Sequence, residues 1–241
     1  MSGTTPEGAR NEQEAARWVR SMFGGIAHRY DLANHLLSAN IDRYWRARTV
    51  RRVRPILERA DARVLDICCG TADLALALSA HHAVLASDFC HPMLAIARQK
   101  IAERRAAAAV FESDALNLPV RDASLDLITV AFGFRNLASY EAGLAEMRRV
   151  LRPGGLAAIL EFSQPRNRAF AGIYNFYSRR VLPIIGQAIT GSRRAYEYLP
   201  ESVRKFPSAE ELAEQMRTAG FRKVEFERMT GGIVALHLGE V

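Results

Sequence analysis

The sequence predicts an α/β fold in which a mostly parallel sheet of seven strands carries helices on both faces. Two observations predict this class. Short apolar runs alternate with helical patterns between residues 63 and 162, and such alternation is typical of parallel sheets covered by helices. Within this region an apolar run stops at Gly70 in a turn, and a helical pattern begins at Asp73. This strand–turn–helix layout is typical of nucleotide-binding units.

The length and composition indicate one globular domain. The 241 residues are 49% hydrophobic, which suffices for a single large core. We therefore expect residues 1–241 to form one domain, with an N-terminal helical segment at residues 13–59 and a helical lid inserted at residues 166–205. The formal net charge of +7 can favour nucleic acid, anionic lipid or an acidic substrate, and it does not choose among them.

The chain carries no export or membrane signal that we can identify. Residues 1–18 lack an apolar signal segment, and no apolar run approaches the length of a membrane span. The three cysteines are too few for a disulfide framework and lack metal-ligand spacing with histidine. We expect a cytoplasmic protein without a metal site. The residues that we interpret as small buried apolar groups in a reducing environment are Cys68, Cys69 and Cys90.

The N-terminal part of the chain is predicted to be helical, and strands and helices then alternate. Residues 1–12 are polar, and we expect them to lack stable structure. From residue 13 to residue 57, apolar side chains recur at mixed three- and four-residue spacing, as in amphipathic helices. The strands and helices expected next are, in turn, strands at 63–68, 83–88, 109–113, 125–131 and 156–162, and helices at 74–79, 92–104 and 140–151.

Turn and capping signals divide the C-terminal part. Residues 152–155, Arg-Pro-Gly-Gly, are a strong helix-stop and turn signal. Residues 166–205 mix aromatic and arginine side chains and interrupt the alternation, which predicts a helical insertion. Ser208, with a glutamate three residues later, opens the next helix with a capping box. Closing strands at 223–229 and 233–238 then form a hairpin that adds one antiparallel strand to the sheet.

The residues that follow the strand ends are the candidate ligand-binding residues, because ligands of open α/β sheets bind beyond the carboxyl ends of the strands. Gly70 lets the backbone approach a ligand, since glycine has no Cβ. Asp88 follows eighteen positions later, where a carboxylate can accept hydrogen bonds from both ribose hydroxyls. Asp114 follows the third strand and can accept a hydrogen bond from the exocyclic amine of adenine.

The turn at Gly70 also limits the kind of nucleotide. A dinucleotide fingerprint needs three glycines spaced G-x-G-x-x-G, and Gly70 stands alone between Cys69 and Thr71. Pyrophosphate is therefore disfavoured, and a dehydrogenase with it. A nucleoside without phosphates fits better, which favours S-adenosylmethionine as the cofactor.

Five further segments carry a resemblance to one family. They read FGGIAHRYD from residue 23, FGFRN from residue 132, LEFS from residue 160, YEYL from residue 196 and TGGIVALH from residue 230. In these segments the chain resembles the ubiquinone/menaquinone biosynthesis C-methyltransferases, which methylate a polyprenylated quinol ring. The resemblance extends over residues 23–239. It implies the Rossmann-like fold of class I methyltransferases, S-adenosylmethionine as donor and a polyprenylated quinol as acceptor.

Carried over position by position, the resemblance implies a set of cofactor contacts. Two positions depart from the family pattern. Ala72 stands in place of a usual second glycine, so that a methyl group lines the turn, and Ala131 stands where some members carry serine, so that no hydroxyl is available there. The contacts carried over fall on Thr71, Asp88, Asp114 and Ala115, and the strand-end argument adds Gly70 and Phe89 to the expected cofactor-binding residues.

Methylation of the ring carbon is easier once an adjacent hydroxyl of the quinol ionises, which calls for a base and a cation. Arg135 is the expected cation, for charge stabilisation or for orienting a water; a simple ion pair with Glu161 is the alternative. His28 and Asp31 are the candidate bases. The residues expected to pack against the ring or to offer hydroxyl groups are Tyr30, Tyr196 and Tyr198.

Other functions and a choice of ring remain open at this stage. A nucleic-acid amino-methyltransferase would carry an Asn/Asp-Pro-Pro-Tyr/Phe segment, where this chain has Ala-Phe-Gly-Phe at residues 131–134. A non-catalytic cofactor-binding subunit of a quinone-synthesis complex is the third class. The Cys-Cys-Gly-Thr turn and the YEYLPES segment favour a naphthoquinol, demethylmenaquinol, over the benzoquinol of ubiquinone biosynthesis.

The expected partners follow from the acceptor. A polyprenyl tail partitions into lipid, so the enzyme must collect its substrate at a bilayer. The aromatic and arginine side chains of residues 166–205 suit transient contact with an anionic membrane surface. We therefore expect peripheral association with the inner face of the cytoplasmic membrane, no nucleic-acid partner, and a homodimer as the candidate assembly.

Overall fold

The fold is a seven-stranded sheet with helices on both faces, which confirms the predicted class. The computed structural model describes residues 3, 4, 6 and 8–241. The strand order across the sheet is β3-β2-β1-β4-β5-β7-β6. The strands are β1 Val64–Ile67, β2 Val84–Asp88, β3 Ala108–Glu112, β4 Leu125–Ala131, β5 Leu151–Phe162, β6 Arg222–Met229 and β7 Val234–Glu240.

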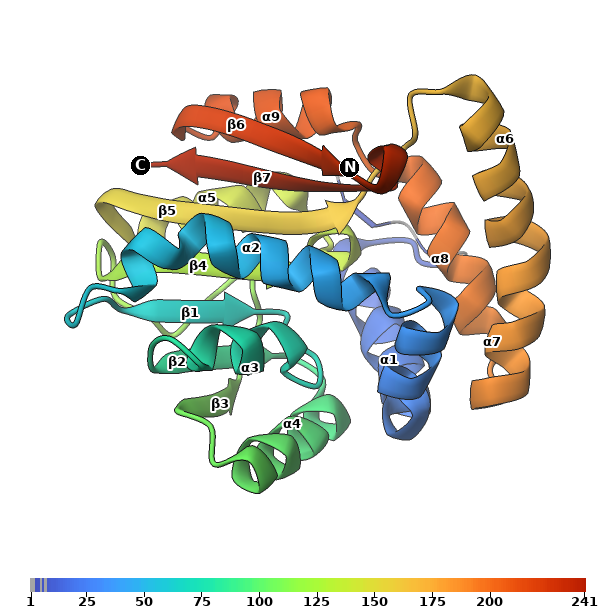
Figure 1. The fold of residues 1–241 in the computed structure, drawn as a ribbon, viewed down its shortest axis with the longest axis horizontal. Helices are drawn as coiled ribbons and strands as arrows, with labels where there is room; N and C mark the ends of the chain where they lie inside the picture. The colour runs from blue at the N-terminus through green and yellow to red at the C-terminus, as the bar shows by residue number, and fades with distance from the viewer. Residues whose placement is uncertain (1–2, 5, 7) are drawn as a thin grey trace.

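Strand directions place the functional end of the sheet. β1 pairs in parallel with both β2 and β4, so the chain order reverses between these neighbours. β7 runs antiparallel to β5 and β6, while the other arrowheads point toward one end of the sheet (Figure 1). The carboxyl ends of β1, β2 and β4 therefore meet at the topological switch point, where open α/β sheets bind ligands.

Helices cover both faces and one end of the sheet. In Figure 1, α2 and α3 lie in front of the strands and α5 and α9 behind them, while α1, α6, α7 and α8 gather beyond the carboxyl ends. The helices are α1 Glu12–Leu37, α2 Ile41–Leu57, α3 Asp73–Ser79, α4 His91–Arg104, α5 Tyr140–Val150, α6 Arg168–Phe176, α7 Leu182–Thr190, α8 Arg193–Lys205 and α9 Ala209–Thr218, with the short turns η1 Phe134–Asn136, η2 Tyr177–Val181 and η3 Thr230–Gly232. The inserted residues 166–205 are thus helical, as predicted.

Alternation along the strands divides the core into two layers. Val64 of β1 and Leu127 of β4 pack in the layer with α2 and α3, whereas Leu65 and Ile128 pack in the layer with α5 and α9. Successive side chains of a strand point to opposite faces, so an apolar strand supplies both layers. This is why continuous apolar runs in the sequence marked the central strands.

The expected start of the strand after α5 was wrong. The turn signal at residues 152–155 ends α5 at Val150, but β5 already begins at Leu151 and includes the signal. The Gly154 N–H donates to the Val241 carbonyl, and the Val241 N–H donates to the Gly155 carbonyl. The C-terminal residue thus supplies partners that extend the strand through a sequence that locally favours a turn.

The N-terminal residues are also not all free of structure. Thr4 is buried; its N–H donates to the Leu137 carbonyl, and its hydroxyl lies 2.7 Å from the hydroxyl of Tyr198. The expectation for residues 1–12 was therefore wrong at Thr4, because a buried partner on α8 satisfies a side chain that is polar in the sequence. Residues 1, 2, 5 and 7 lie outside the described part of the chain.

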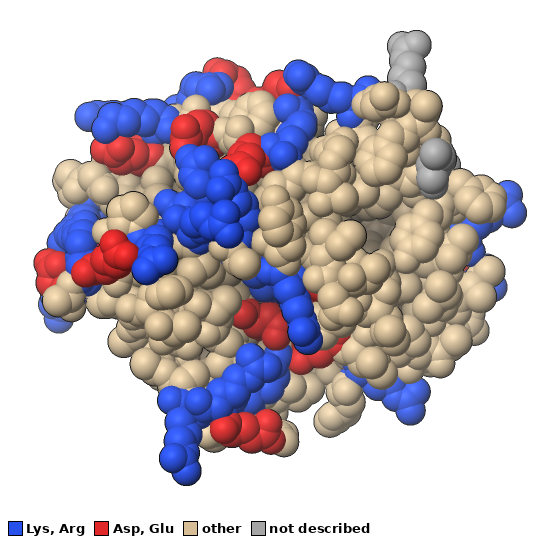
Figure 2. Space-filling view, viewed as in Figure 1, with Lys and Arg blue, Asp and Glu red and all other residues tan. Residues whose placement is uncertain are grey.

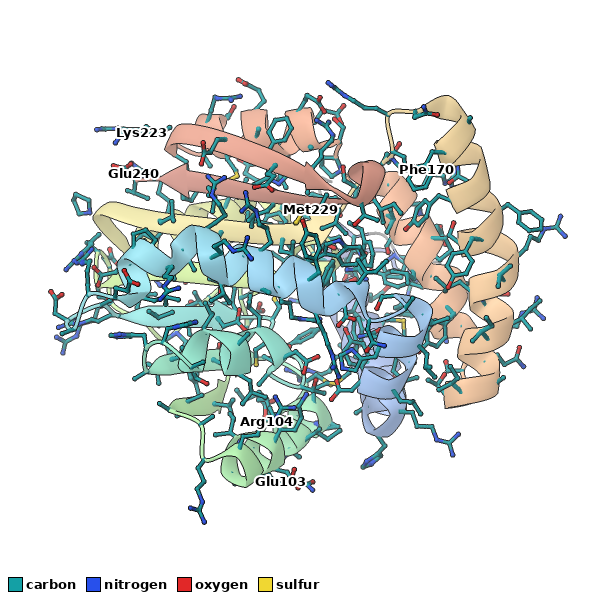
Figure 3. All side chains as sticks on the ribbon, in the orientation of Figure 1. Glu103, Arg104, Phe170, Lys223, Met229 and Glu240 are labelled. Carbon is teal, nitrogen blue, oxygen red and sulfur yellow. The ribbon has the colours of Figure 1, made fainter. Side chains whose placement is uncertain are left out.

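The C-terminal hairpin links the sheet to the helices of the insertion. Phe170 of α6 lies beside η3, which follows β6, and the position that a Cβ of Gly231 would take is 2.6 Å from its ring (Figure 3). At the opposite end of the hairpin, Lys223 donates to Glu240 at 2.8 Å (Figure 3). None of the described helices combines the length and apolar composition of a segment that crosses a bilayer.

His237 makes folding stability sensitive to pH. It is buried on β7, and its Nε2–H donates to the Ala209 carbonyl at 2.8 Å. Burial lowers the pKa of His237 to about 4, from 6.5 in an unfolded chain. Between these values the unfolded state binds more protons, so the contribution of this histidine is present above pH 6.5 and is lost as pH falls.

We expect the unfolding free energy to drop by about 1.5 kcal/mol between pH 6.5 and pH 5 through His237 alone. Urea unfolding of wild type and His237→Gln at both pH values measures this contribution. The exposed His81→Gln variant serves as control. An equal pH dependence in all three proteins would show that His237 does not titrate on unfolding.

Candidate functional site

A first cavity lies at the switch point. Its empty volume, which includes the part open to solvent, is about 1000 Å³, and it lies between the carboxyl ends of β1, β2 and β4 and the N-terminal part of α1. The structure brings all of the cofactor-binding residues expected from the sequence into its lining: Gly70, Thr71, Asp88, Phe89, Asp114 and Ala115. These residues come together because each follows a parallel strand, and parallel strands end at one edge of the sheet.

The turn after β1 requires unusual backbone angles. Gly70 has a φ of 54°, in the left-handed region, and a Cβ at this position would meet no atom within 4 Å. Glycine is favoured there by the backbone angle rather than by crowding. Ala72 has a φ of 69° and a buried side chain that packs in the core. The expectation that its methyl group lines the turn was wrong, because the side chain is directed beneath it.

A second glycine permits the close approach of β1 and β4. A Cβ on Gly133 would lie 2.4 Å from the Cβ of Cys68, which is too close for any side chain without a shift of the backbone. Cys68 and Gly133 both line the first cavity. The segments after β1 and β4 can therefore lie this close together only because residue 133 has no side chain.

Asp88 is held ready to accept hydrogen bonds in this cavity. The Gly70 N–H donates to its Oδ2 at 2.9 Å, and the Cys90 N–H donates to its Oδ1 at 2.8 Å. Burial raises the pKa of Asp88, and the backbone donors partly offset this effect. Each carboxylate oxygen keeps a further lone pair, so the side chain can still accept two hydroxyl groups of a ligand. The carboxyl group therefore fits a ribose.

Asp66 is a cavity residue that the sequence reasoning missed. It lies on β1, is almost fully buried, and accepts a hydrogen bond from the Thr129 hydroxyl at 2.6 Å. Burial raises the pKa of Asp66 to about 7. The available signal was a carboxylate inside an otherwise apolar strand, since such residues are rarely buried without a role.

The two candidate bases lie outside both cavities. His28 is exposed on α1. Asp31 accepts the Thr71 hydroxyl hydrogen at 2.5 Å and pairs with Lys100 at 2.7 Å. Neither residue lines the first or the second cavity. Asp31 instead ties α1 to the turn that forms the cofactor cavity.

The second cavity lies between α1, α2 and the inserted helices, and encloses about 2090 Å³ of empty volume. Figure 2 shows a hollow in a face made mostly of uncharged residues on this side of the molecule. Three expected catalytic residues line the cavity: Arg135, Tyr196 and Tyr198. The Tyr198 hydroxyl donates to the Asn136 side chain at 2.9 Å, which links α8 to η1. Burial raises the pKa of Tyr196 to about 12.

Arg135 forms the ion pair with Glu161 that stood as the alternative to a catalytic role. Its Nη1 donates to Glu161 at 2.9 Å, and its backbone N–H donates to the other carboxylate oxygen at 3.0 Å. Burial would lower the pKa of Arg135, but the charge and hydrogen bond of Glu161, together with Tyr198 and Tyr30, outweigh it and raise the pKa. Its Nη2 donates to none of the described side chains or carbonyls, so the N–H groups of this nitrogen remain available to a ligand, while the Phe162 ring lies against the guanidinium at 5.2 Å. The ion pair with Glu161 is therefore compatible with charge stabilisation by Arg135.

One wall of the second cavity is aromatic. The ring centroids of Phe132 and Phe162 are 4.8 Å apart, and Trp45 lies 5.8 Å from the first and 6.2 Å from the second. The Trp45 indole N–H donates to the Thr230 hydroxyl at 2.8 Å, which fixes the ring plane. Offset aromatic packing of this kind suits a flat aromatic ligand.

The two cavities share a boundary. Four described residues line both of them: Phe23, Tyr30, Arg46 and Phe132. The guanidinium of Arg46 lies over the Phe132 ring at 5.5 Å. The two cavities therefore adjoin at these four side chains.

Next to this boundary, three potential metal ligands come within 4.8 Å of one another, namely His35, Asp42 and Asp73. Spacing in the sequence did not reveal this group, because its members lie on α1, α2 and α3. The guanidinium of Arg46 pairs with Asp42 and lies 3.7 Å from Asp73. Arg46, together with Lys100, which pairs with Asp73 at 2.6 Å, thus already supplies positive charge to both carboxylates.

Comparison with known proteins defines the class to which the fold and the cavities belong. Residues 9–240 match the ubiE/COQ5 methyltransferase family. The chain belongs to this family and is a methyltransferase, as the resemblance implied.

Individual relatives are similar over nearly their whole length. The chain is 48% identical to the demethylmenaquinone methyltransferase of Thermus thermophilus over 91% of this chain and 99% of that protein. It is 43% identical to the demethylmenaquinone methyltransferase of Deinococcus radiodurans, over 95% of each chain. It is 42% identical to the ubiquinone/menaquinone biosynthesis C-methyltransferase UbiE of Geobacter sulfurreducens, over 94% of this chain and 90% of that protein.

Solved structures share the fold at low identity. A possible histamine N-methyltransferase of Thermotoga maritima, described as S-adenosylmethionine-dependent, matches with a TM-score of 0.63 and 19% identity, over 91% of this chain and 98% of its own. The [4+2]-cyclase SpnF matches with a TM-score of 0.66 and 19% identity, over 97% and 80%. Proteins with different reactions therefore share this architecture, and the lining of the cavities must define the chemistry.

We expect Asp88→Ala to weaken binding of S-adenosylhomocysteine by roughly a hundredfold, because two charge-assisted hydrogen bonds are lost, at about 3 kcal/mol in total. Titration calorimetry on the folded variant measures this. Glu103→Ala, which removes an exposed carboxylate of α4 that lines neither cavity, serves as control for general disturbance. Wild-type affinity in Asp88→Ala would remove Asp88 from the cofactor site.

Proposed function

We propose that the protein transfers a methyl group from S-adenosylmethionine to a ring carbon of a polyprenylated quinol, converting a demethylmenaquinol to a menaquinol. The observation that carries this proposal is the junction of two unlike cavities. The first offers carboxylates for a nucleoside, and the second is larger, mostly apolar and aromatic on one wall. The names of the Thermus and Deinococcus relatives support the same reaction.

The residues of the first cavity suit the donor. S-adenosylmethionine supplies an electrophilic methyl group on a positively charged sulfur. Asp88 would hold the ribose hydroxyls, and the exposed Asp114, which accepts the Leu116 N–H on Oδ1, has a second oxygen for the adenine amine. The protein then contributes mainly position, since holding two reactants in line removes much of the barrier.

The residues of the second cavity suit the acceptor. The wall of Trp45, Phe132 and Phe162 would pack against the flat ring. The Nη2 of Arg135 would donate to the phenolate oxygen as charge develops there. Tyr196 and Tyr198 add hydroxyl groups to the lining, and the apolar part of the cavity would accommodate the first part of the prenyl chain.

The naphthoquinol is proposed over the benzoquinol for two reasons. The turn after β1 and the segment at the start of α8 carry the residues that favoured it in the sequence. Relatives at 48% and 43% identity are named for demethylmenaquinone alone, whereas the Geobacter relative at 42% is named for both quinones. Methylation of both rings is therefore the second candidate.

The function is tested by transfer of a labelled methyl group from S-adenosylmethionine to reduced, short-tailed naphthoquinol and benzoquinol acceptors. We expect transfer to the naphthoquinol. Absence of transfer to either acceptor by wild type would instead favour a non-catalytic subunit.

We expect the Arg135→Lys variant to have a lower kcat and an unchanged affinity for S-adenosylhomocysteine. The reason is that lysine lacks the planar guanidinium, which can donate to Glu161 and to the acceptor at the same time. A parallel loss of cofactor affinity would place Arg135 in the cofactor site.

We further propose that the protein collects its acceptor at an anionic membrane surface, at the mouth of the second cavity. Leu36 and Ile41 line this cavity and are also exposed, at 56% and 39%. Phe176 and Ile184, on the neighbouring helices α6 and α7, are 66% and 70% exposed. In Figure 2 the face around the hollow is nearly free of charged side chains, and basic side chains lie beside it. Apolar side chains flanked by basic ones suit an interfacial surface.

Two arginines of the insertion already have partners within the protein. The proposed docking surface therefore rests on the apolar side chains. Arg193 pairs with Glu197 at 2.6 Å, and Arg194 lies over the Trp18 ring at 4.9 Å. Peripheral association through the rim of the cavity would let the prenyl chain pass from lipid to protein without exposure to water, where each methylene group costs about 0.8 kcal/mol.

Co-sedimentation with vesicles that contain anionic lipid tests this docking. We expect the double variant Phe176→Asn/Ile184→Asn to lose vesicle binding and to retain activity on a short-tailed acceptor. Leu85→Asn is the matched control, because Leu85 is an apolar residue of β2 with 50% exposure that lies away from this face. Equal binding of both variants would contradict the docking surface.

A further inference from the structure

The second cavity contains one acidic side chain. Among the described residues that line it, Asp42 is the single carboxylate, and there is no histidine. The Asp42 side chain is almost fully buried near the start of α2. A methyl acceptor bound in this cavity must lose a hydroxyl proton, and general bases in proteins need to lie within hydrogen-bond reach of the proton they take.

The candidates from the sequence do not meet this condition. His28 is exposed on α1, and Asp31 lies on the cofactor side, where it accepts hydrogen bonds from Thr71 and Lys100. Neither lines the second cavity. The sequence does not single out Asp42, because nothing in the local sequence distinguishes it from a solvated residue at a helix start.

Asp42 is fixed by partners from two helices. The Ser38 hydroxyl donates to its Oδ1 at 2.7 Å, the Nδ1–H of His35 donates to its Oδ2 at 2.9 Å, and Arg46 donates to the same oxygen. Burial would raise the pKa of Asp42, but the Ser38 hydrogen bond, the Arg46 charge and His35 together lower it. The carboxylate is therefore ionised at neutral pH and needs no prior loss of a proton.

Other charged groups balance this carboxylate. Arg46 also lies 3.7 Å from Asp73 of α3, and Asp73 pairs with Lys100 of α4 at 2.6 Å. Arg46 lines both cavities, whereas Asp42 lines only the second and Asp73 only the first. The guanidinium of Arg46 thus connects Asp42 in the second cavity with Asp73 in the first.

We propose that Asp42 is the general base for the quinol hydroxyl, and that His35 and Arg46 are positioning residues that aim it. This inference rests on the proposed function and adds a catalytic residue to it. Asp42 takes the hydroxyl proton as the electron pair of that O–H bond moves into the ring. The ring carbon forms a bond with the methyl group, and the sulfur keeps the electron pair of the broken S–C bond.

The remaining step restores the aromatic ring. Water takes the hydrogen from the methylated carbon, and the carboxyl group of Asp42 returns its proton to the carbonyl oxygen. The products are methylated quinol, S-adenosylhomocysteine and one proton released to solvent. Asp42 ends the cycle ionised, as it began.

The test compares Asp42→Asn with wild type on two short-tailed naphthoquinols, one unsubstituted and one carrying electron-withdrawing fluorine, which makes the hydroxyl more acidic. We expect kcat of the variant to fall by about a hundredfold on the unsubstituted acceptor at pH 7. The ratio of wild-type to variant kcat should shrink on the fluorinated acceptor and as pH rises, because an acceptor that ionises by itself needs no base. Affinity for S-adenosylhomocysteine should not change.

Two further variants separate chemistry from folding. His35→Gln keeps the carboxylate and a hydrogen-bond donor, so we expect a smaller deficit with the same dependence on acceptor acidity; it serves if Asp42→Asn does not fold. Glu227→Gln is the matched control, since Glu227 pairs with Arg48 and Arg52 of the same helix and lines neither cavity.

Two outcomes would overturn the inference. A deficit in Asp42→Asn and His35→Gln that is the same for both acceptors and at all pH values would mean a structural role. Wild-type kcat in a folded Asp42→Asn protein would exclude it as the base. Inactivity of wild type itself on every quinol would overturn the proposed function and this inference together, so the two failures are distinguishable.

Discussion

The buried ion pair between Arg135 and Glu161 holds together the strand ends on which both cavities depend. Glu161 lies at the end of β5 and accepts the backbone N–H groups of Arg135 and Phe162 as well as the guanidinium. Arg135 also donates to the Phe132 carbonyl and, at 3.3 Å, to Ser202 of α8. Removing one partner of such a pair costs about 3–5 kcal/mol, because the other charge is left buried without compensation.

This pair determines more than stability. It fixes the segment 132–136 after β4, and that segment supplies Phe132 to both cavities and Asn136 to the hydrogen bond with Tyr198. The segment that lines the cavities therefore also forms the contact between the sheet and the inserted helix α8. A buried charge pair is seldom the most stable solution for a core, and its value here lies in holding one arrangement of the strand ends.

Helix α1 has a comparable role on the other side of the site. Its first half contributes Ala16 and Val19 to the first cavity, and its second half contributes Ile26 and Asn34 to the second. Asp31 anchors it to the turn after β1 through Thr71. Since SpnF shares the fold and is named for a different reaction, such covering elements and their side chains, rather than the sheet, distinguish one activity from another.

The sequence by itself determined the strands, the turn at Gly70 and a set of candidate cofactor-binding residues that lie together in one cavity. These follow from local periodicity and from a topological rule: side chains after parallel strands meet at one edge, so Asp88 and Asp114 could be expected at the same edge from the sequence. Tertiary structure alone decided which residues of α1 and α2 face a cavity. An amphipathic helix with neighbours on several sides has no single inward face that its sequence can reveal, so the sequence did not show that Asp42 lines the second cavity while His28 and Asp31 do not. Burial decided the rest, since the raised pKa of Asp66 and the ordered Thr4 depend on partners distant in the chain.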